Sequence, residues 1–525
     1  MIRINQLKIR PDESEEKLSG QILQALEIKK SDLLQWRTAK KSIDARGSQV
    51  WFVYTVDVRI KNEERVLNKN KKKSIQKKEE SPPVKRPTYR LAQQPIIIGA
   101  GPAGLFCALV LAEQGARPII VERGKRVSDR IKDIQKFWQE SILDPESNIQ
   151  FGEGGAGTFS DGKLTTLIKD KEGHGRYVLD QMIEAGAPKE ISYLNKPHIG
   201  TDRLRSVMVR IREKIISFGG VFLFEEKLLD IQCEDNRIRG IVTSKGIYKS
   251  GVVVLGIGHS ARDTFQILND HIEIVPKPFS VGVRIEHLRE EIDRWQYGSA
   301  VEKYALPAAD YKLVHHCKNG RSVYTFCMCP GGVVTGASSQ IGGVVTNGMS
   351  YYKRDLTNSN SAVLVNVTPA DFPSKHPLAG MVFQKELEEK AYEAGGGLYH
   401  APVQLFEDFV SGQSSSRFGR IRPTYQPGTN FFDLNKLLPE YVSQGLKEGI
   451  QAFGTRIKGF DAPDSLMTAV ETRSSSPVRL VRDENRMTSI KGLYAIGEGS
   501  GYAGGIMSSA IDGVKAAEGI LEGNS

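Results

Sequence analysis

The hydrophobic pattern changes character near residue 93. After this point, short apolar runs are each followed by a stretch with helical spacing, at 95–98, 118–121, 221–224 and 252–255. This alternation is typical of a parallel sheet with crossover helices. No segment repeats at a fixed period, which argues against a solenoid or a propeller. The pattern therefore predicts an α/β fold built on a Rossmann-type domain.

A mixed pattern interrupts this domain in the second half of the chain. Strand-like runs such as 279–285 and 362–367 are interleaved there with helical stretches such as 381–394. We therefore expect an inserted mixed α+β domain, since 525 residues are enough for two or three hydrophobic cores. The predicted bounds are 93–265 and 486–525 for the Rossmann-type domain and 266–485 for the insert.

The first 60 residues have the pattern of a small α+β module. Residues 2–9 largely alternate between apolar and polar, 14–27 carry apolar residues at helical spacing, and 50–58 form a strand-like run. We expect a ferredoxin-like module over 1–60. The segment 61–92 loses periodicity, gathers lysines and contains two consecutive prolines, which predicts an exposed linker.

Charge is distributed unevenly along the chain. Residues 1–90 contain 22 Lys and Arg against 12 Asp and Glu, whereas the remaining residues contain 50 of each. The net charge of +10 therefore belongs to the N-terminal part. A lysine run of this kind is more often a solvated linker than a contact with nucleic acid or a membrane, so neither partner is expected for the main body.

Cysteine content and the N-terminal sequence set the expected compartment. Five cysteines in a long chain do not indicate a disulfide framework, and the first 13 residues lack the apolar core of a signal peptide. We expect a reducing, cytoplasmic environment. The uncharged stretch 91–112 has the length of a membrane span, but three glycines and a proline interrupt it, which favours a strand followed by a helix.

The first chemical motif is a Gly-x-Gly-x-x-Gly sequence at 99–104, which ends an apolar run and opens a helical stretch. In such a unit Gly99 permits a tight turn, Gly101 lets a pyrophosphate approach the backbone, and Gly104 allows the helix to pack against the strand. The phosphates would bind at the helix N-terminus, where free N–H groups and the dipole favour negative charge. The motif predicts a dinucleotide-binding turn.

A carboxylate follows this motif at the expected distance. The next apolar run ends at Glu122, 18 residues after Gly104. A carboxylate at this position can accept hydrogen bonds from both ribose hydroxyls of an adenosine. The alternative is a surface acid at a strand end, and the position within the unit favours the ribose role.

Two further glycine-rich segments are suited to a planar ring. The segment 152–164 has four glycines in its first six residues and ends in Lys163 and Leu164, so that it can lie flat against a ring. In the segment 492–507 a strand ends at Gly497 and Glu498 and leads into a small-residue helix. That helix would place its positive N-terminus at a ring that accepts electrons. The alternatives are a surface loop and an ordinary buried strand and helix.

Together these segments resemble the two-dinucleotide-binding-domain flavoproteins of the glutathione-reductase type. More closely, the chain is similar to a bacterial family of uncharacterised FAD-dependent, also called NAD-utilising, dehydrogenases. The segments that carry this similarity are 151–164, 254–264, 326–332, 471–479 and 497–513. The resemblance covers most of the chain from residue 94 and implies one non-covalent FAD, whereas the substrate of that family is not established. Where the wider class has Asp, this chain has Glu498, which is one methylene longer.

The motifs and the resemblance together predict a set of FAD-binding residues. The resemblance also implies that the backbone of residues 227 and 228, after the run 221–224, contacts the adenine. The predicted residues are Gly99, Gly101, Pro102, Ala103, Gly104, Glu122, Arg123, Lys163, Leu164, Lys227, Leu228, Gly256, Gly497, Glu498, Ile506 and Met507.

The glycine-containing run 252–261 has two interpretations. It could be a second fingerprint for NAD(P), but no acid or arginine ends a strand at the required spacing, where Lys277 and Pro278 stand instead. We therefore expect it to return the chain to the FAD sheet. NADH or NADPH would then act only as a transient electron donor in the substrate cavity.

Several other side chains also have two interpretations. Cys327 and Cys329 are a candidate redox pair, but their spacing differs from C-x-x-C, and we favour a packing role. His315 and His316 near Cys317 lack a second ligand pair, so that no metal is predicted. His259 is either a proton donor or a turn residue. Four arginines either clamp an acidic substrate or form structural salt bridges, namely Arg262, Arg422, Arg473 and Arg479.

These observations predict an FAD-dependent oxidoreductase, a dehydrogenase that transfers a hydride through flavin N5 to or from a small substrate, with an acidic molecule as the candidate. Two alternatives stay open. One is a nucleic-acid-associated flavoprotein that uses its basic N-terminal module, and the other is a non-catalytic FAD-binding scaffold. The sequence does not identify the catalytic residues or the substrate.

Overall fold

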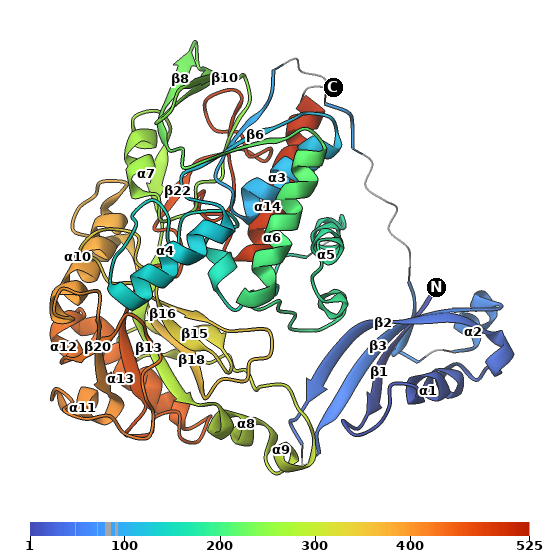
Figure 1. Cartoon of the computed structure of the whole chain (residues 1–525). Coiled ribbons are helices and arrows are strands. Elements are labelled where there is room, and N and C mark those ends of the chain that lie inside the picture. Colours follow the sequence, from blue (N-terminus) through green and yellow to red (C-terminus); the bar gives the residue numbers. More distant parts are fainter. Residues whose placement is uncertain (48, 71, 79–85, 90–92, 170, 524–525) are drawn as a thin grey trace.

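The computed structural model describes the chain except residues 48, 71, 79–85, 90–92, 170 and 524–525 (Figure 1). Its N-terminal module, blue in Figure 1, is an antiparallel sheet with strand order β2-β3-β1-β4 and two helices. This βαββαβ arrangement confirms the predicted ferredoxin-like fold. The elements are β1 (Ile2–Ile9), α1 (Lys17–Leu26), β2 (Leu33–Asp44), β3 (Trp51–Ile60), α2 (Glu63–Lys69) and β4 (Ile75–Lys77).

The predicted linker 61–92 is wrong in its first part, because α2 and β4 complete the module. Their apolar residues are few, and the surrounding lysines hide them from a periodicity argument. Val66 and Leu67 nevertheless pack against the core of the module, and Ile75 is buried in it. The module also contacts the main body, where Lys41 N–H donates to the Tyr193 carbonyl at 2.7 Å and Asn195 N–H donates to the Lys41 carbonyl at 2.8 Å. Parts of the predicted linker, 71, 79–85 and 90–92, lie outside the described residues.

A five-stranded parallel sheet forms the centre of the main body, with strand order β23-β11-β5-β6-β7. It confirms the Rossmann-type fold, since the predicted apolar runs are its strands and helices connect them. The strands are β5 (Ile96–Ile98), β6 (Ile119–Glu122), β7 (Val221–Phe224), β11 (Val253–Leu255) and β23 (Leu493–Ala495). The helices are α3 (Pro102–Glu113), α4 (Val127–Glu140), α5 (His174–Glu184), α6 (Thr201–Ser217), α7 (Arg262–Asn269) and α14 (Ile506–Gly523).

Helix α3 is the most buried helix of this domain, because α6 and α14 lie beside it (Figure 1). Its closest approach to α14 depends on Gly513, where a Cβ atom would lie 2.1 Å from the Ala103 carbonyl oxygen. The small residues of α14 therefore allow two buried helices to pack at short range. Among the residues that the structure describes, no helix has the length and apolar character needed to cross a membrane.

The inserted domain is built on a seven-stranded mixed sheet of order β14-β15-β18-β13-β21-β19-β20. Its strands are β13 (Phe279–Leu288), β14 (Val314–His316), β15 (Ser322–Cys329), β18 (Asn358–Val367), β19 (Ala401–Leu405), β20 (Thr429–Phe431) and β21 (Leu466–Glu471), with a separate ribbon of β16 (Val333–Gly336) and β17 (Thr346–Met349). Its helices are α8 (Arg289–Tyr297), α9 (Ala300–Lys303), α10 (Ala379–Ala394), α11 (Phe406–Ser411), α12 (Leu434–Leu437) and α13 (Glu440–Gly454).

A two-stranded antiparallel ribbon connects the two domains. Strand β12 (Ile274–Pro276) pairs with β22 (Val478–Leu480), and both share a hydrophobic core with residues of the five-stranded parallel sheet. The same core contains the antiparallel strands β8 (Leu228–Glu234), β9 (Arg237–Thr243) and β10 (Ile247–Lys249). The connection between the domains thus lies a few residues inside the ends of the predicted insert.

Candidate functional site

A cavity of about 950 Å³ extends from the carboxyl ends of β5, β6 and β11 to the sheet of the inserted domain. This edge of a parallel sheet is where α/β proteins hold nucleotides. The cavity is lined by most of the predicted FAD-binding residues and by residues of β15, β17 and β21. Three predicted residues do not line it, since Gly104 lies in the first turn of α3 against the Gly99 carbonyl, and both Leu164 and Met507 are buried in the core.

The glycines of the dinucleotide turn differ in what surrounds them. Gly99 has φ +101°, and a Cβ atom there would lie 2.4 Å from the Gly256 carbonyl oxygen. At Gly104 a Cβ atom would lie 2.0 Å from the Gly99 carbonyl oxygen. At Gly101, however, the nearest atom within 4 Å would be Gly155 Cα, at 3.9 Å. The turn thus needs two glycines for its own packing, and the third leaves room for a ligand.

Glu122 joins three segments around this turn. Its buried carboxylate accepts hydrogen bonds from the N–H groups of Ala100 at 2.8 Å, Gly124 at 2.9 Å and Gly152 at 3.0 Å. A carboxylate offers about four acceptor positions. One position therefore remains, where the sequence predicts bonds to two ribose hydroxyls.

A network of charges surrounds the end of the cavity next to β6. Arg123 donates to Asp263 at 2.9 and 3.0 Å and to Glu146 at 2.7 Å, and its guanidinium lies 4.1 Å from the centre of the Phe151 ring. Lys227 pairs with the same two carboxylates. Burial alone would raise the pKa of Asp263, but hydrogen bonds from Arg123 and Lys227 lower it to about 2. Arg123 and Lys227 are therefore held in place along the cavity wall.

The glycine-rich segment 152–164 is held by Arg130 of α4. This guanidinium is fully buried and donates to the carbonyl oxygens of Asn148 and Ile149 at 2.7 Å each, of Glu153 at 2.7 Å and of Gly155 at 3.0 Å. A carbonyl that points at a buried cation cannot turn into the cavity. Arg130 thereby fixes the shape of a segment whose glycines would otherwise leave it free.

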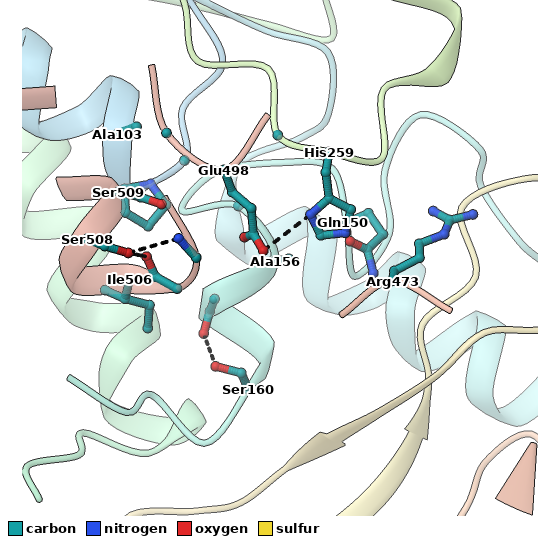
Figure 2. Close-up of a pocket in the computed structure, with 18 of the residues that line it drawn as sticks. Ala103, Gln150, Ala156, Ser160, His259, Arg473, Glu498, Ile506, Ser508 and Ser509 are labelled. Atoms are coloured by element: carbon teal, nitrogen blue, oxygen red, sulfur yellow. Dashed lines mark hydrogen bonds and ion pairs between the residues drawn. The ribbon is translucent and has the colours of Figure 1, made fainter. Parts of the chain in front are cut away.

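The C-terminal segment is fixed by a comparable contact. Asp512 of α14 accepts a hydrogen bond from Gly497 N–H at 2.8 Å and pairs with Arg482 at 2.8 and 3.0 Å. The following residue, Glu498, lies 3.5 Å from Nδ1 of His259, as Figure 2 shows. The other ring nitrogen of His259, Nε2, is buried without a hydrogen-bond partner among the described residues. An unpaired buried nitrogen on a cavity wall is a position at which a ligand can bind.

The inserted domain contributes a second group of charges to the cavity. Asp161 of the glycine-rich segment pairs with Arg354, which donates to it from Nε at 2.9 Å, and accepts a short hydrogen bond from Ser350. Burial would raise the pKa of Asp161, but Arg354 and Lys163 lower it. Asp161 and Arg354 thus form an ion pair between the glycine-rich segment and the inserted domain.

The arginines that sequence analysis considers for an acidic substrate have other partners. Arg262 and Arg473 both pair with the buried carboxylate of Glu388, at distances of 2.8 to 3.0 Å. Arg479 lies over the ring of Tyr502, and Arg422 over that of Phe418. The structure therefore favours the salt-bridge interpretation for Arg262 and Arg473. Of the two, Arg473 also lines the cavity (Figure 2).

The histidine and cysteine candidates lie in different places. His315, Cys317 and Glu448 offer ligand atoms within 4.8 Å of one another, far from the glycine-rich segments in sequence. Glu448 comes from α13, and no spacing in the sequence could have indicated it. His316 instead bonds to Ser322. Cys327 lines the cavity, whereas Cys329 is buried behind it.

Sequence reasoning missed the residues that position the site from a distance. Arg130 and Asp512 do not line the cavity and belong to no recognised motif. In the sequence, each is an ordinary charged residue on a helix. Arg354 reaches Asp161 across 193 residues. Only the place of Arg482 before the predicted strand and of Asp512 within the helix that follows it could have suggested their pairing.

Comparison with known proteins identifies the domains. A family model described as an FAD-binding domain matches residues 93–132, and one described as the C-terminal domain-like part of an FAD-dependent protein matches residues 278–474. A domain of unknown function matches residues 1–59. An uncharacterised protein of Clostridium beijerinckii is 45% identical over 527 residues, which cover 99% of this chain and 98% of that protein.

Solved structures show more distant similarity. A quinol fumarate reductase of E. coli has 13% sequence identity and a TM-score of 0.37, over 82% of this chain and 70% of that chain. A glycine oxidase from Bacillus cereus has 11% identity and a TM-score of 0.36, over 82% of this chain and 98% of that chain. Similarity at this level says nothing about activity.

The sheet, the dinucleotide turn and the two family models define a flavoprotein with FAD as its cofactor. Within this class, the chain belongs to the same family as the Clostridium beijerinckii protein. The residues of the cavity fit the cofactor. The open space at Gly101 lies at the N-terminus of α3, and His259, whose Nε2 is unpaired, lines the same cavity. Neither feature serves the packing of the protein itself.

Proposed function

We propose that this flavoprotein is an oxidoreductase of the dehydrogenase type, which transfers a hydride between FAD and a small molecule bound against the inserted domain. The main support is that one cavity contains both the dinucleotide turn and the residues of β15, β17 and β21. A cofactor seated on the turn would therefore share its space with a ligand on the inserted domain. FAD, when bound, supplies the hydride acceptor at N5.

In this proposal, the predicted residues divide the work of holding the cofactor. The N-terminus of α3, with Gly101 as its capping residue, binds the pyrophosphate through free N–H groups. The remaining acceptor position of Glu122 takes a ribose hydroxyl. The segment held by Arg130 and the N-terminus of α14 enclose the ring, and the positive end of that helix dipole favours negative charge there.

His259 and Glu498 are the proton-handling groups of this proposal. Glu498 faces Nδ1 of His259 and so orients the ring, which leaves Nε2 to donate to or accept from the ligand. Asp161 neutralises Arg354, whereas Arg262 and Arg473 share the single carboxylate of Glu388 and keep one net positive charge. An acidic substrate would therefore find this charge and that of Lys163, for which no ion pair is present among the described residues.

NADH or NADPH is proposed as a transient electron donor. The run after β11 does not form a separate nucleotide site, because Gly256 packs against Gly99 and lines the same cavity. A nicotinamide would thus have to enter the substrate side of the cavity. The glutathione-reductase-type subfamily, which has its own NAD(P) domain, is supported less by this arrangement.

The basic residues of the N-terminal module do not favour the nucleic-acid alternative. Arg3, Lys78 and Arg37 lie within 3.6 Å of the buried carboxylate of Asp57. Lys41 likewise pairs with Glu15 at 2.7 Å. These four basic side chains are therefore held by contacts within the module, although the module keeps a net positive charge because its acidic residues are fewer.

The experiment is an anaerobic titration of the purified holoprotein with NADH and with NADPH, followed through the flavin absorbance. We expect one of the two to bleach the flavin, and a small acceptor to restore the absorbance. A His259→Asn variant should retain FAD, but the nicotinamide nucleotide should reduce its flavin more slowly than in the wild type. Full FAD occupancy, with no reduction by either nucleotide and no reoxidation by any small acceptor, would instead support a scaffold.

A further inference from the structure

Two cysteines of β15 stand at the wall of the cavity. Cys327 lines the cavity, and Cys329 is fully buried directly behind it. The other described cysteines, Cys107, Cys233 and Cys317, do not line it. This placement separates the pair from cysteines that only fill space in a core.

A β-bulge in β15 coincides with the two cysteines. Phe326 pairs with Ala362 and Cys329 with Asn360, so that β15 has one more residue than β18 over this stretch. The extra residue has the left-handed conformation, with φ +43° at Cys327. In a regular strand, residues two apart are separated by roughly 6.6 Å, close to the upper limit of about 6.8 Å for the Cα atoms of a disulfide. The regular spacing thus lies at the edge of the range that a disulfide requires, and the bulge releases the pair from that regular spacing.

The surroundings of the pair distinguish its two sulfurs. The Cys329 thiol donates a hydrogen bond to the Cys327 carbonyl oxygen at 3.3 Å, and the interaction between the two thiols lowers the pKa of Cys327 and raises the pKa of Cys329. Burial opposes ionisation of Cys327, but Lys163 and Arg284 also lower its pKa. One accessible thiolate beside one buried thiol is the usual arrangement of an attacking and a resolving cysteine.

The charges around Cys327 connect it to the cofactor side of the cavity. Lys163 belongs to the glycine-rich segment and lines the same cavity. Arg284 is fully buried, donates to the Cys327 carbonyl oxygen at 3.0 Å, and is held by Glu471 through two bonds of 3.0 Å. The bulge is thus anchored on one side by the inserted domain and faces the glycine-rich segment on the other.

We propose that Cys327 and Cys329 are a redox-active pair that exchanges two electrons with the flavin. The inference rests on the proposed function, because it assigns FAD as the partner. When the flavin is reduced and the pair is a disulfide, two electrons and two protons pass from FADH2 to the cysteines, the Sγ–Sγ bond breaks, and two thiols form with FAD. In the opposite direction, the dithiol loses two protons and two electrons to FAD, and the Sγ–Sγ bond forms.

The test is an anaerobic dithionite titration of air-oxidised holoprotein, followed through the flavin absorbance. Wild-type protein should consume two electron pairs per FAD, one for the flavin and one for the disulfide. Cys327→Ser and Cys329→Ser should each consume one pair. Cys317→Ser, a buried cysteine outside the cavity, is the matched control and should consume two. Cys327 lines the cavity, so a serine there disturbs the packing less than one at the buried Cys329. Cys327→Ser therefore still tests the pair if Cys329→Ser does not fold.

A second measurement separates this inference from the proposed function. Thiols of air-oxidised wild-type protein are alkylated under denaturing conditions before and after reduction, and the peptide that contains both cysteines is weighed by mass spectrometry. We expect both cysteines to resist alkylation before reduction and to be alkylated after it. Bound FAD with one electron pair consumed and both cysteines freely alkylated would overturn the redox pair. Protected cysteines in a protein that binds no FAD would instead overturn the proposed function.

Discussion

Gly101 and Gly104 allow a direct test of whether the dinucleotide turn holds a ligand. At Gly101 an added Cβ atom has no protein neighbour closer than 3.9 Å, and the residue has φ −75°. An alanine there fits the protein but occupies the space proposed for the pyrophosphate. At Gly104 the added atom would lie 2.0 Å from the Gly99 carbonyl oxygen, so that an alanine requires a movement of the backbone.

The expected magnitudes separate the two variants. In Gly101→Ala, a loss of about 0.5–1 kcal/mol at the helix cap is offset by a gain of about 0.4–1 kcal/mol from the less flexible unfolded chain. Stability without FAD should thus change little. Losing one or two hydrogen bonds to a charged phosphate costs about 2–4 kcal/mol, which weakens FAD binding roughly 30- to 700-fold. Gly104→Ala should lower the free energy of unfolding by about 1–3 kcal/mol through overpacking.

The assay combines urea unfolding of the protein freed of FAD with a fluorescence titration of the refolded protein with FAD. Gly20→Ala is the control, because Gly20 lies within α1 with no atom within 4 Å of an added Cβ. This variant should be stabilised by about 0.5–1 kcal/mol and should bind FAD as the wild type does. Normal FAD affinity in Gly101→Ala would refute the proposed position of the pyrophosphate.

Three further predictions follow from the buried charges and the cavity thiol. Arg130→Met should lower the free energy of unfolding by about 3 kcal/mol, since four carbonyls lose their donor, whereas Lys132→Met on the exposed side of α4 should change it by less than about 0.5 kcal/mol in the same urea experiment. Glu388→Gln should cost about 3–5 kcal/mol at pH 7, because Arg262 and Arg473 lose their buried partner. Burial would raise the pKa of Glu388, but the two arginines lower it well below its usual range. The stabilisation by the ionised carboxylate is therefore fully present above about pH 4.3, and the difference in unfolding free energy between wild type and variant should shrink as the pH falls further. A difference that stays constant with pH would contradict this prediction. Iodoacetamide should label Cys327 less than tenfold more slowly at pH 6.5 than at pH 8.5, whereas an ordinary thiol with a pKa of about 8.5 slows roughly 50-fold; a 50-fold decrease at Cys327 would contradict the lowered pKa.

The sequence predicts the local parts of this fold well, because they depend on neighbouring residues. The apolar run before Gly99 and the glycines of the turn indicate a strand, a tight turn and a helix within 20 residues. The same holds for β1, α1 and β3 of the ferredoxin-like module. In α2 and β4, by contrast, two or three apolar residues among lysines are too few for a period, and only packing against the rest of the module reveals them.

The parts of the site that depend on distant contacts could not be predicted. Arg130 has the surroundings of an exposed helical residue in the sequence, and its burial follows from how the glycine-rich segment folds over α4. The bulge at Cys327 likewise arises from a register shift between β15 and β18, which alternation in β15 does not show. An alternating strand would have suggested two equivalent cysteines, whereas the structure gives one accessible and one buried.

The central claim is that two segments far apart in the sequence, near residues 100 and 500, enclose a single FAD in this cavity. The most direct measurement is a crystal structure of the holoprotein. The account predicts the pyrophosphate beside Gly101 at the N-terminus of α3, and the flavin ring between the glycine-rich segment and the N-terminus of α14, with one face open toward Cys327. A ring bound outside this cavity, or one whose two faces are both covered by the main body, would contradict it.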